Sequence, residues 1–224
     1  ADGKLVGSNF LREYNAIRGV GPISVDPAAQ AHGVGRVLMK AAVDRARGQP
    51  GVRLVQEAVN GASLALYASL GFEAREPLVL VRGQFREEPP AGYTVRPVEA
   101  GDRASCAALC ERVHGFARAE LWDNLERDHP LMAVRAGRVV AYVSAGALGM
   151  GAHGVGETEA DLCTLLLAVG AATPDPLSLI VPTRRASFFR WCLSQGLRAL
   201  KPLTLMTIGA YQEPTGAYFP SIAY

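Results

Sequence analysis

The chain has 224 residues, of which 49% are hydrophobic and 20% charged, and its formal net charge at pH 7 is +2. This composition supplies enough apolar side chains for one large or two small cores and excludes a disordered chain. Charges of both signs are interspersed, so the sequence lacks the basic block that a nucleic-acid or membrane surface needs. No apolar run approaches the roughly 18 residues of a membrane span, and residues 1–4 do not resemble a signal peptide. We therefore expect a cytoplasmic protein with neither nucleic acid nor membrane as a partner.

The first third of the chain predicts two strand–helix units. A strand over residues 19–25 leads through a loop at 26–36 into a helix over 37–46. A buried strand over 52–60 is followed by a helix over 62–70, which ends at a glycine before another strand.

The remainder of the chain predicts a longer α/β unit. We expect strands over 93–98, 131–135, 138–145, 177–181 and 203–208, and helices over 102–114, 117–127, 158–172 and 184–195. Residues 209–224 are aromatic and proline-rich without periodicity, which predicts an ordered tail. Such a tail either lines a substrate site or seals a hydrophobic edge.

An internal repeat links the two parts. Residues 71–81 match residues 196–206 in register, and residues 2–7 echo residues 136–141 more weakly, which gives a repeat of about 125 to 134 residues. Charged, Pro and Gly residues at 86–92 mark the linker, so we expect domains at 1–86 and 92–224. The first copy lacks the initial strand and two helices of the second. It is therefore N-terminally incomplete as presented, unless another surface covers its open edge.

The loop at 26–36 has the features of an anion site. Gly33 and Gly35 allow backbone N–H groups to turn inward, and the following helix adds unsatisfied donors and a partial positive charge, which Arg36 supplements. The alternative is an ordinary glycine-rich turn. A nucleotide-triphosphate loop is excluded because no Lys-Ser/Thr follows the glycines, and Leu38 stands at the third glycine of a dinucleotide fingerprint.

Two motifs resemble those of the GNAT superfamily of N-acetyltransferases. The first is the pattern Val25-x-Pro27-x-x-Gln30-x-x-Gly33-x-Gly35-x-x-Leu38, which resembles the family's coenzyme-A motif. The second is the spacing of Asn60, Tyr67 and Gly71-Phe72, which is similar to the family's second signature. The resemblance covers residues 1 to about 85. It implies two GNAT-like α/β domains, each a mixed, mostly antiparallel sheet flanked by helices.

The resemblance also implies a reaction and its residues. The protein would move an acetyl group from acetyl-CoA to an amine by direct attack in a ternary complex, with Tyr67 as the acid that protonates the departing thiolate. A main-chain N–H near Val25 would stabilise the oxyanion. The general base stays open between Glu57, Glu13 and a water relay. The residues expected to bind the coenzyme are Val25, Gln30, Ala31, His32, Gly33, Val34, Gly35, Arg36, Asn60 and Ser63.

The second copy is expected to be silent. Aligned with the first, it places Glu157, Ala160 and Leu162 at the positions of Gln30, Gly33 and Gly35, and Glu159 and Asp161 add further negative charge. Cys192 replaces Tyr67. We interpret the glycines at 149, 151, 154 and 156 as a flexible turn beside His153.

Metal chemistry is not indicated, although Cys106, Cys110 and His114 are spaced to share a helix face. We interpret them as a buried helical stripe. Two other functions stay open: a non-catalytic coenzyme-A-binding or regulatory module, and a dimerisation scaffold. The acceptor, whether a small molecule or a peptide amine, is not encoded in these motifs, and a homodimer is also left open.

Overall fold

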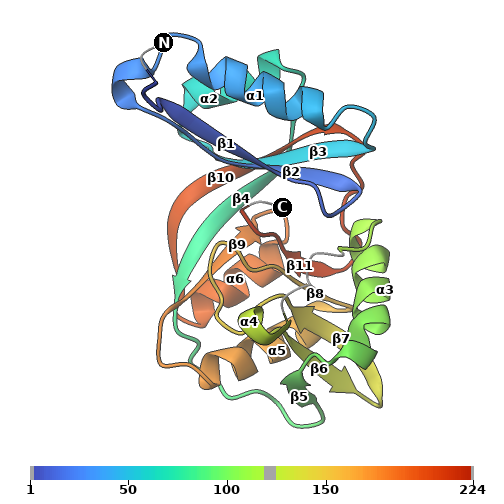
Figure 1. Ribbon diagram of the computed structural model, residues 1–224. Coiled ribbons are helices and arrows are strands. Elements are labelled where there is room, and N and C mark those ends of the chain that lie inside the picture. Colours follow the sequence, from blue (N-terminus) through green and yellow to red (C-terminus); the bar gives the residue numbers. More distant parts are fainter. Residues whose placement is uncertain (1–2, 119–124, 223–224) are drawn as a thin grey trace.

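A computed structural model describes residues 3–118 and 125–222, which form two sheets with helices around them (Figure 1). Sheet A contains, in spatial order, β1 (Gly7–Arg12), β2 (Ile17–Val25), β3 (Gly51–Glu57), β10 (Arg198–Gly209), β4 (Glu73–Gly83) and β9 (Leu177–Pro182). Sheet B contains β11 (Ala217–Phe219), β8 (Gly154–Gly156), β7 (Arg138–Val143), β6 (Leu131–Arg135) and β5 (Thr94–Pro97). The helices are α1 (Val34–Arg45), α2 (Gly61–Ser69), α3 (Arg103–His114), α4 (Leu125–Asp128), α5 (Glu159–Ala171) and α6 (Ala186–Ser194). Two short 3₁₀ turns lie at Pro27–Ala29 and Ala100–Asp102.

The two copies of the repeat interlock in sheet A. Strand β10, from the second copy, lies between β3 and β4 of the first, and β4 in turn lies between β10 and β9 of the second. Leu78 pairs with Leu203, which is the equivalent residue of the repeat, 125 residues later. The β4–β10 pair has two register shifts, one on each strand, and the two lie at equivalent positions of the repeat. Likewise, Glu57 pairs with Leu203 as Pro182 pairs with Leu78. An approximate twofold relation therefore passes through the middle of this sheet.

Alternating side chains of the central strands serve different cores. Met206 contacts the core under α1 and α2, whereas Val79 and Val81 contact the core under α5 and α6. Their neighbours on the opposite face, including Leu78 and Leu203, form a third core. Because successive side chains of a strand point to opposite faces of the sheet, the central strands contribute to cores of both copies at once. A fourth core lies between α3 and the outer face of sheet B.

The fold class expected from the sequence is confirmed: sheet A is mixed, with one parallel pair, sheet B is antiparallel, and helices flank both. The elements expected after residue 90 are present, apart from the helix over 117–127, most of which lies outside the described residues. The proposed boundaries, 1–86 and 92–224, stay a prediction. No described helix has the length and apolar character needed to cross a membrane.

Two smaller interpretations have different outcomes. Cys106, Cys110 and His114 are buried along α3, as a helical stripe should be. The interpretation of the glycines at 149, 151, 154 and 156 as a flexible turn is wrong in part, because Gly154 and Gly156 lie in the buried strand β8. An added Cβ would lie 2.4 Å from the Phe219 ring at Gly154 and 2.9 Å from a carbonyl at Gly156, so close packing requires glycine at both.

Candidate functional site

A wedge between β2 and β3 is the centre of the candidate site. These parallel strands pair only from Ile17–Gly51 to Gly19–Arg53 and then separate. Pro22, just beyond the last pair, has no N–H to donate to a ladder. The separated halves border two cavities of about 590 and 350 Å³, which share the side chains of Ile23, Asn60, Ser63 and Tyr67. We call them the upper cavity and the lower cavity, respectively.

The glycine-rich loop forms the far end of the upper cavity. Asp26 stabilises the start of the loop by accepting a hydrogen bond from the N–H of Ala28 at 2.9 Å. Ala31 and Gly33 both have positive φ, 64° and 82°, and this left-handed conformation turns the chain into α1. Gly33 is the N-cap and offers no side chain to the helix.

The backbone amides at the start of α1 are available to a ligand. Val37 makes the first helical hydrogen bond, to the carbonyl of Gly33 at 3.1 Å. Within the described part of the chain, the amides of residues 31–36 have no acceptor. Several N–H groups therefore converge at a helix N-terminus without a capping carboxylate, which is the arrangement that binds phosphate or another anion.

Most residues predicted to bind a coenzyme meet in the upper cavity. Its lining includes Val25, Gln30, Ala31, Gly33, Val34, Gly35, Arg36, Asn60, Ser63 and Tyr67. His32 is the exception: its side chain is exposed, and its Nδ1 lies 2.7 Å from the carbonyl oxygen of Gln30. The amide of Gln30 donates to the carbonyl of Val25 at 3.2 Å, and Arg36 donates to the Ser69 hydroxyl at 3.0 Å.

Helix α2 brings three of these residues to the wedge. Asn60 is its N-cap and accepts a hydrogen bond from the N–H of Ser63 at 3.0 Å, so its side-chain oxygen already has a role in the helix. One turn further on, Tyr67 is only 6% exposed and packs edge-on against Phe72. Burial raises the pKa of the Tyr67 phenol, and a hydrogen bond with Ser63 partly offsets that rise. The phenol is therefore protonated at neutral pH.

The two carboxylates considered as general base have different surroundings. Glu57 lines the lower cavity and is paired with Lys201 of β10. Glu13 lies outside both cavities and pairs with Arg45 at 3.0 Å, and the hydrogen bond from Arg45 lowers the pKa of Glu13. Of the two, only Glu57 is near the wedge.

The lower cavity contains residues that the sequence did not identify. Gln56 lies on β3, whereas Met150, Lys201, Leu203 and Ile222 come from the second copy. A polar residue two positions after Leu54, on the same face of a strand expected to be buried, was a usable signal for Gln56. The others are distant in sequence and reach the cavity only because β10 enters sheet A. The lower cavity also shares Gly21 and Pro22 with a cleft of about 790 Å³ between the two copies.

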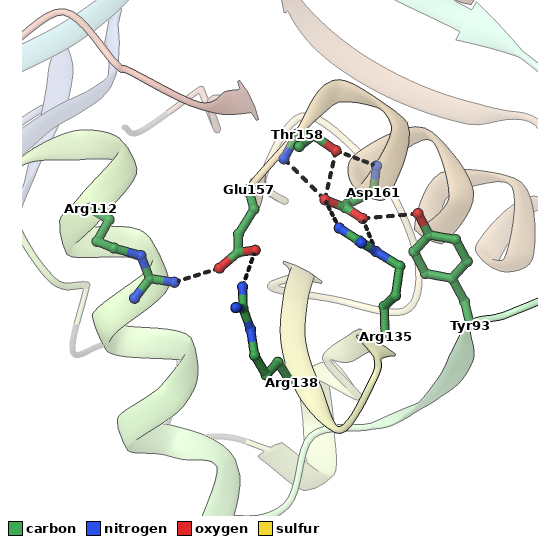
Figure 2. Close-up of polar contacts among 7 residues, drawn as sticks. All are labelled: Tyr93, Arg112, Arg135, Arg138, Glu157, Thr158 and Asp161. Carbon is green, nitrogen blue, oxygen red and sulfur yellow. Dashed lines mark hydrogen bonds and ion pairs between the residues drawn. The ribbon is translucent and has the colours of Figure 1, made fainter.

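The equivalent helix N-terminus in the second copy is already occupied by the protein. Thr158 and Asp161 form a reciprocal capping box at the start of α5 (Figure 2). The fully buried Asp161 carboxylate also accepts hydrogen bonds from Tyr93 at 2.9 Å and from Arg135 at 3.0 Å. Burial raises the pKa of Asp161, but the hydrogen bonds from Thr158, Arg135 and Tyr93 outweigh it, and the pKa lies below its ordinary value. At the start of α5, side chains of the protein therefore accept hydrogen bonds from the N–H groups of Thr158 and Asp161.

The tail contacts β8 and β9 of the second copy, which correspond to β2 and β3 of the first. Strand β11 pairs with β8 and also contacts β9, the counterparts of the two strands that separate in the first copy. Beyond β11, the N–H of Ile222 donates to the carbonyl of Met150 at 2.7 Å, and both residues line the lower cavity. The tail thus seals one edge of the second copy, as one of the two alternatives expected, and Ile222 also borders the wedge of the first copy.

The first part of the chain is similar to known acetyltransferases. Residues 1–74 match the model of the acetyltransferase (GNAT) domain. A mycothiol acetyltransferase of Beutenbergia cavernae is 42% identical over 74 residues, which are 32% of this chain and 25% of that protein. The N-alpha-acetyltransferase RimI of Mycobacterium tuberculosis is 41% identical over 80 residues, 36% of this chain and 48% of that protein. The chain therefore spans about a quarter to a half of the length of these relatives.

Solved structures match nearly the whole chain. A candidate acetyltransferase from Pyrococcus horikoshii has a TM-score of 0.77 at 15% identity, over 98% of this chain and 75% of that chain. A tandem GNAT protein from the clavulanic acid biosynthesis pathway has a TM-score of 0.57 at 14% identity, over 95% and 82%. At these identities the likeness concerns the fold, and that fold includes a tandem arrangement.

Proposed function

We propose, on the premise that residues 1–74 of this chain belong to the GNAT acetyltransferase domain family, that the protein transfers an acetyl group from acetyl-CoA to an amine. One observation carries the proposal: no described residue accepts a hydrogen bond from the amides of residues 31–36, which lie beside a wedge that holds the buried Tyr67. An anion-binding cup and a protonated phenol on one cavity are what a diphosphate-bearing thioester requires.

The upper cavity suits coenzyme A at both ends. The free amides and the positive end of α1 would hold its diphosphate. Gly35 adds no side chain there, although a Cβ would make only an ordinary contact, 3.5 Å from Leu66. The open edges of β2 and β3 would accept the amides of the pantetheine arm, beside Asn60 and Ser63.

The reaction that fits the site is direct attack in a ternary complex. The amine nitrogen attacks the thioester carbon, the carbon–sulfur bond breaks, and the thiolate takes a proton from the Tyr67 hydroxyl. A phenol with a raised pKa is suited to this step because it holds its proton at neutral pH. The amine loses its own proton to a base or a water chain.

A specific observation favours a second candidate function, coenzyme binding without turnover. Glu57 is the single carboxylate that lines either cavity of the wedge among the described residues, and it is already paired with Lys201. A protein with a complete coenzyme site and no base would bind acetyl-CoA and regulate through it.

Acetyl-CoA titration and thiol release separate these functions. Acetyl-CoA should raise the melting temperature progressively with ligand excess, as mass action requires. Release of free thiol in the presence of an amine panel then identifies an enzyme, and binding without release identifies a sensor.

The role of Tyr67 is tested by Tyr67→Phe, which keeps the ring packed on Phe72. We expect kcat to fall by about 100-fold, the usual contribution of a positioned acid, with the acetyl-CoA melting shift unchanged. Equal turnover by the variant and the parent would remove Tyr67 from the mechanism.

A further inference from the structure

Gln56 is a buried side chain whose polar atoms have no partner. It is 6% exposed, and neither its Oε1 nor its Nε2 makes a hydrogen bond to any described residue. A buried amide that loses its bonds to water without replacing them is unfavourable, and native proteins rarely leave such groups unmatched. A glutamine in this position is therefore explained by something that binds to it.

The position of Gln56 shows that this ligand would not be the coenzyme itself. Its side chain lines the lower cavity together with Tyr67, but it does not line the upper cavity that ends at the glycine-rich loop. Leu54, two residues earlier on β3, packs in the same core as Tyr67, so Gln56 shares the sheet face of the phenol. A group at Gln56 would lie beside the reacting thioester and outside the coenzyme's own channel.

The surroundings of Gln56 restrict the shape of this ligand. Near the wedge the lower cavity has the Glu57–Lys201 pair, and its remaining lining from the second copy is apolar, with Met150, Leu203 and Ile222. The cavity opens at Gly21 and Pro22 toward the larger cleft between the copies. A compact polar head with an apolar remainder fits this arrangement.

We propose that the lower cavity is the acceptor site and that Gln56 determines its specificity, by selecting amines that carry a hydroxyl or carbonyl oxygen on the carbon adjacent to the amine-bearing carbon. Gln56 Oε1 accepts an N–H of the amine, and Gln56 Nε2 donates to the neighbouring oxygen. A simple alkylamine satisfies only the first of these groups and leaves the second buried without a partner. This inference rests on the proposed acetyl transfer and adds the class of acceptor to it.

The test compares Gln56→Met with the parent on matched amine pairs: glycinamide against propylamine, and phenylalaninamide against phenethylamine. Methionine keeps the volume and removes both polar atoms, so the variant should be at least as stable as the parent to heat. The control is Gln195→Met, the same change at a buried glutamine after α6, outside both cavities of the wedge, whose Oε1 is also unpaired.

We expect Gln56→Met to raise KM for each oxygen-bearing amine about tenfold relative to its plain partner, because only the oxygen-bearing amine loses the second hydrogen bond, and to leave KM for acetyl-CoA unchanged. Gln195→Met should leave the ratio within each pair as in the parent. A KM effect confined to acetyl-CoA would assign Gln56 to the coenzyme and overturn the proposal. An unchanged ratio would overturn it too, because Gln56 would then hold only water.

Direct binding separates the failure of this inference from the failure of the proposed function. Calorimetric titration of the four amines into the protein with coenzyme A requires no turnover. Preference of the parent for the oxygen-bearing partner, lost in Gln56→Met, supports the acceptor site even if no thiol is released. Turnover by the parent without such a preference contradicts the inference and leaves acetyl transfer standing.

Discussion

Gly33 and Gly35 differ in why they are glycine. Gly33 has a φ of 82°, which a residue with a side chain adopts only at a cost of about 1–2 kcal/mol. Gly35 lies within α1 with ordinary helical geometry, and an added Cβ would contact Leu66 at 3.5 Å without a clash. The backbone conformation therefore requires glycine at position 33, whereas at position 35 neither conformation nor packing does, as the proposed close approach of a coenzyme predicts.

Gly35→Ala should separate binding from stability. Alanine favours helix over glycine by about 0.5–1 kcal/mol, so the free energy of unfolding should stay equal or rise. Acetyl-CoA affinity should fall at least about tenfold, because the methyl group obstructs the amide cup. Urea denaturation and acetyl-CoA titration measure the two effects. Gly61→Ala, at the first turn of α2 with open space around it, is the matched control and should leave affinity unchanged.

Helices α1 and α5 occupy equivalent places and treat their N-termini in opposite ways. The start of α1 is a glycine followed by amides that no residue in the described ranges accepts from, whereas at the start of α5 Thr158 and Asp161 cap each other with side chain and amide (Figure 2). A capping box stabilises its helix by about 1 kcal/mol without any ligand. The second copy thus has a structural cap at the place where the first copy has the candidate ligand site.

Asp161→Asn should lower the free energy of unfolding by an amount that depends on pH. The folded pKa of Asp161 lies below its ordinary value, so its contribution to stability is present above the unfolded pKa of about 3.9 and is lost as pH falls through the folded pKa. We expect the variant to be about 2 kcal/mol less stable at pH 7, with the deficit shrinking below about pH 4. Urea denaturation across this range checks the trend, and the exposed Asp175→Asn is the control. A deficit independent of pH would show that packing, not charge, is lost.

Local signals explain which elements the sequence predicted. The helix over 158–172 was recognisable from its cap and apolar content, and the glycine-rich loop from its position between a strand and a helix. The place of β10 was not recognisable, because residues 71–81 and 196–206 have the same pattern and either is compatible with pairing inside its own copy. Lys201 and Ile222 could not be predicted as cavity residues for the same reason, since their position depends on that pairing.

The molecule as a whole is connected through sheet A (Figure 1). Each copy places one strand between two strands of the other, so in sheet A the strands of neither copy form one uninterrupted block. Residues 1–86 without β10 would leave β3 and β4 without the strand that joins them, and their core would lose Met206. Stability is therefore a shared property of both copies, and the candidate site depends on the second copy for one wall.

Fragment expression tests this dependence. We expect residues 1–91 and 92–224, produced separately, to lack a cooperative urea transition, because each would expose unpaired central strands and part of a core. The intact chain should unfold in a single transition, with a slope typical of its full length. Co-expression of the two fragments should restore a folded complex that binds acetyl-CoA, because the linker at 86–92 contributes no strand. Cooperative unfolding together with acetyl-CoA binding by residues 1–91 alone would show that the first copy needs no strand from the second.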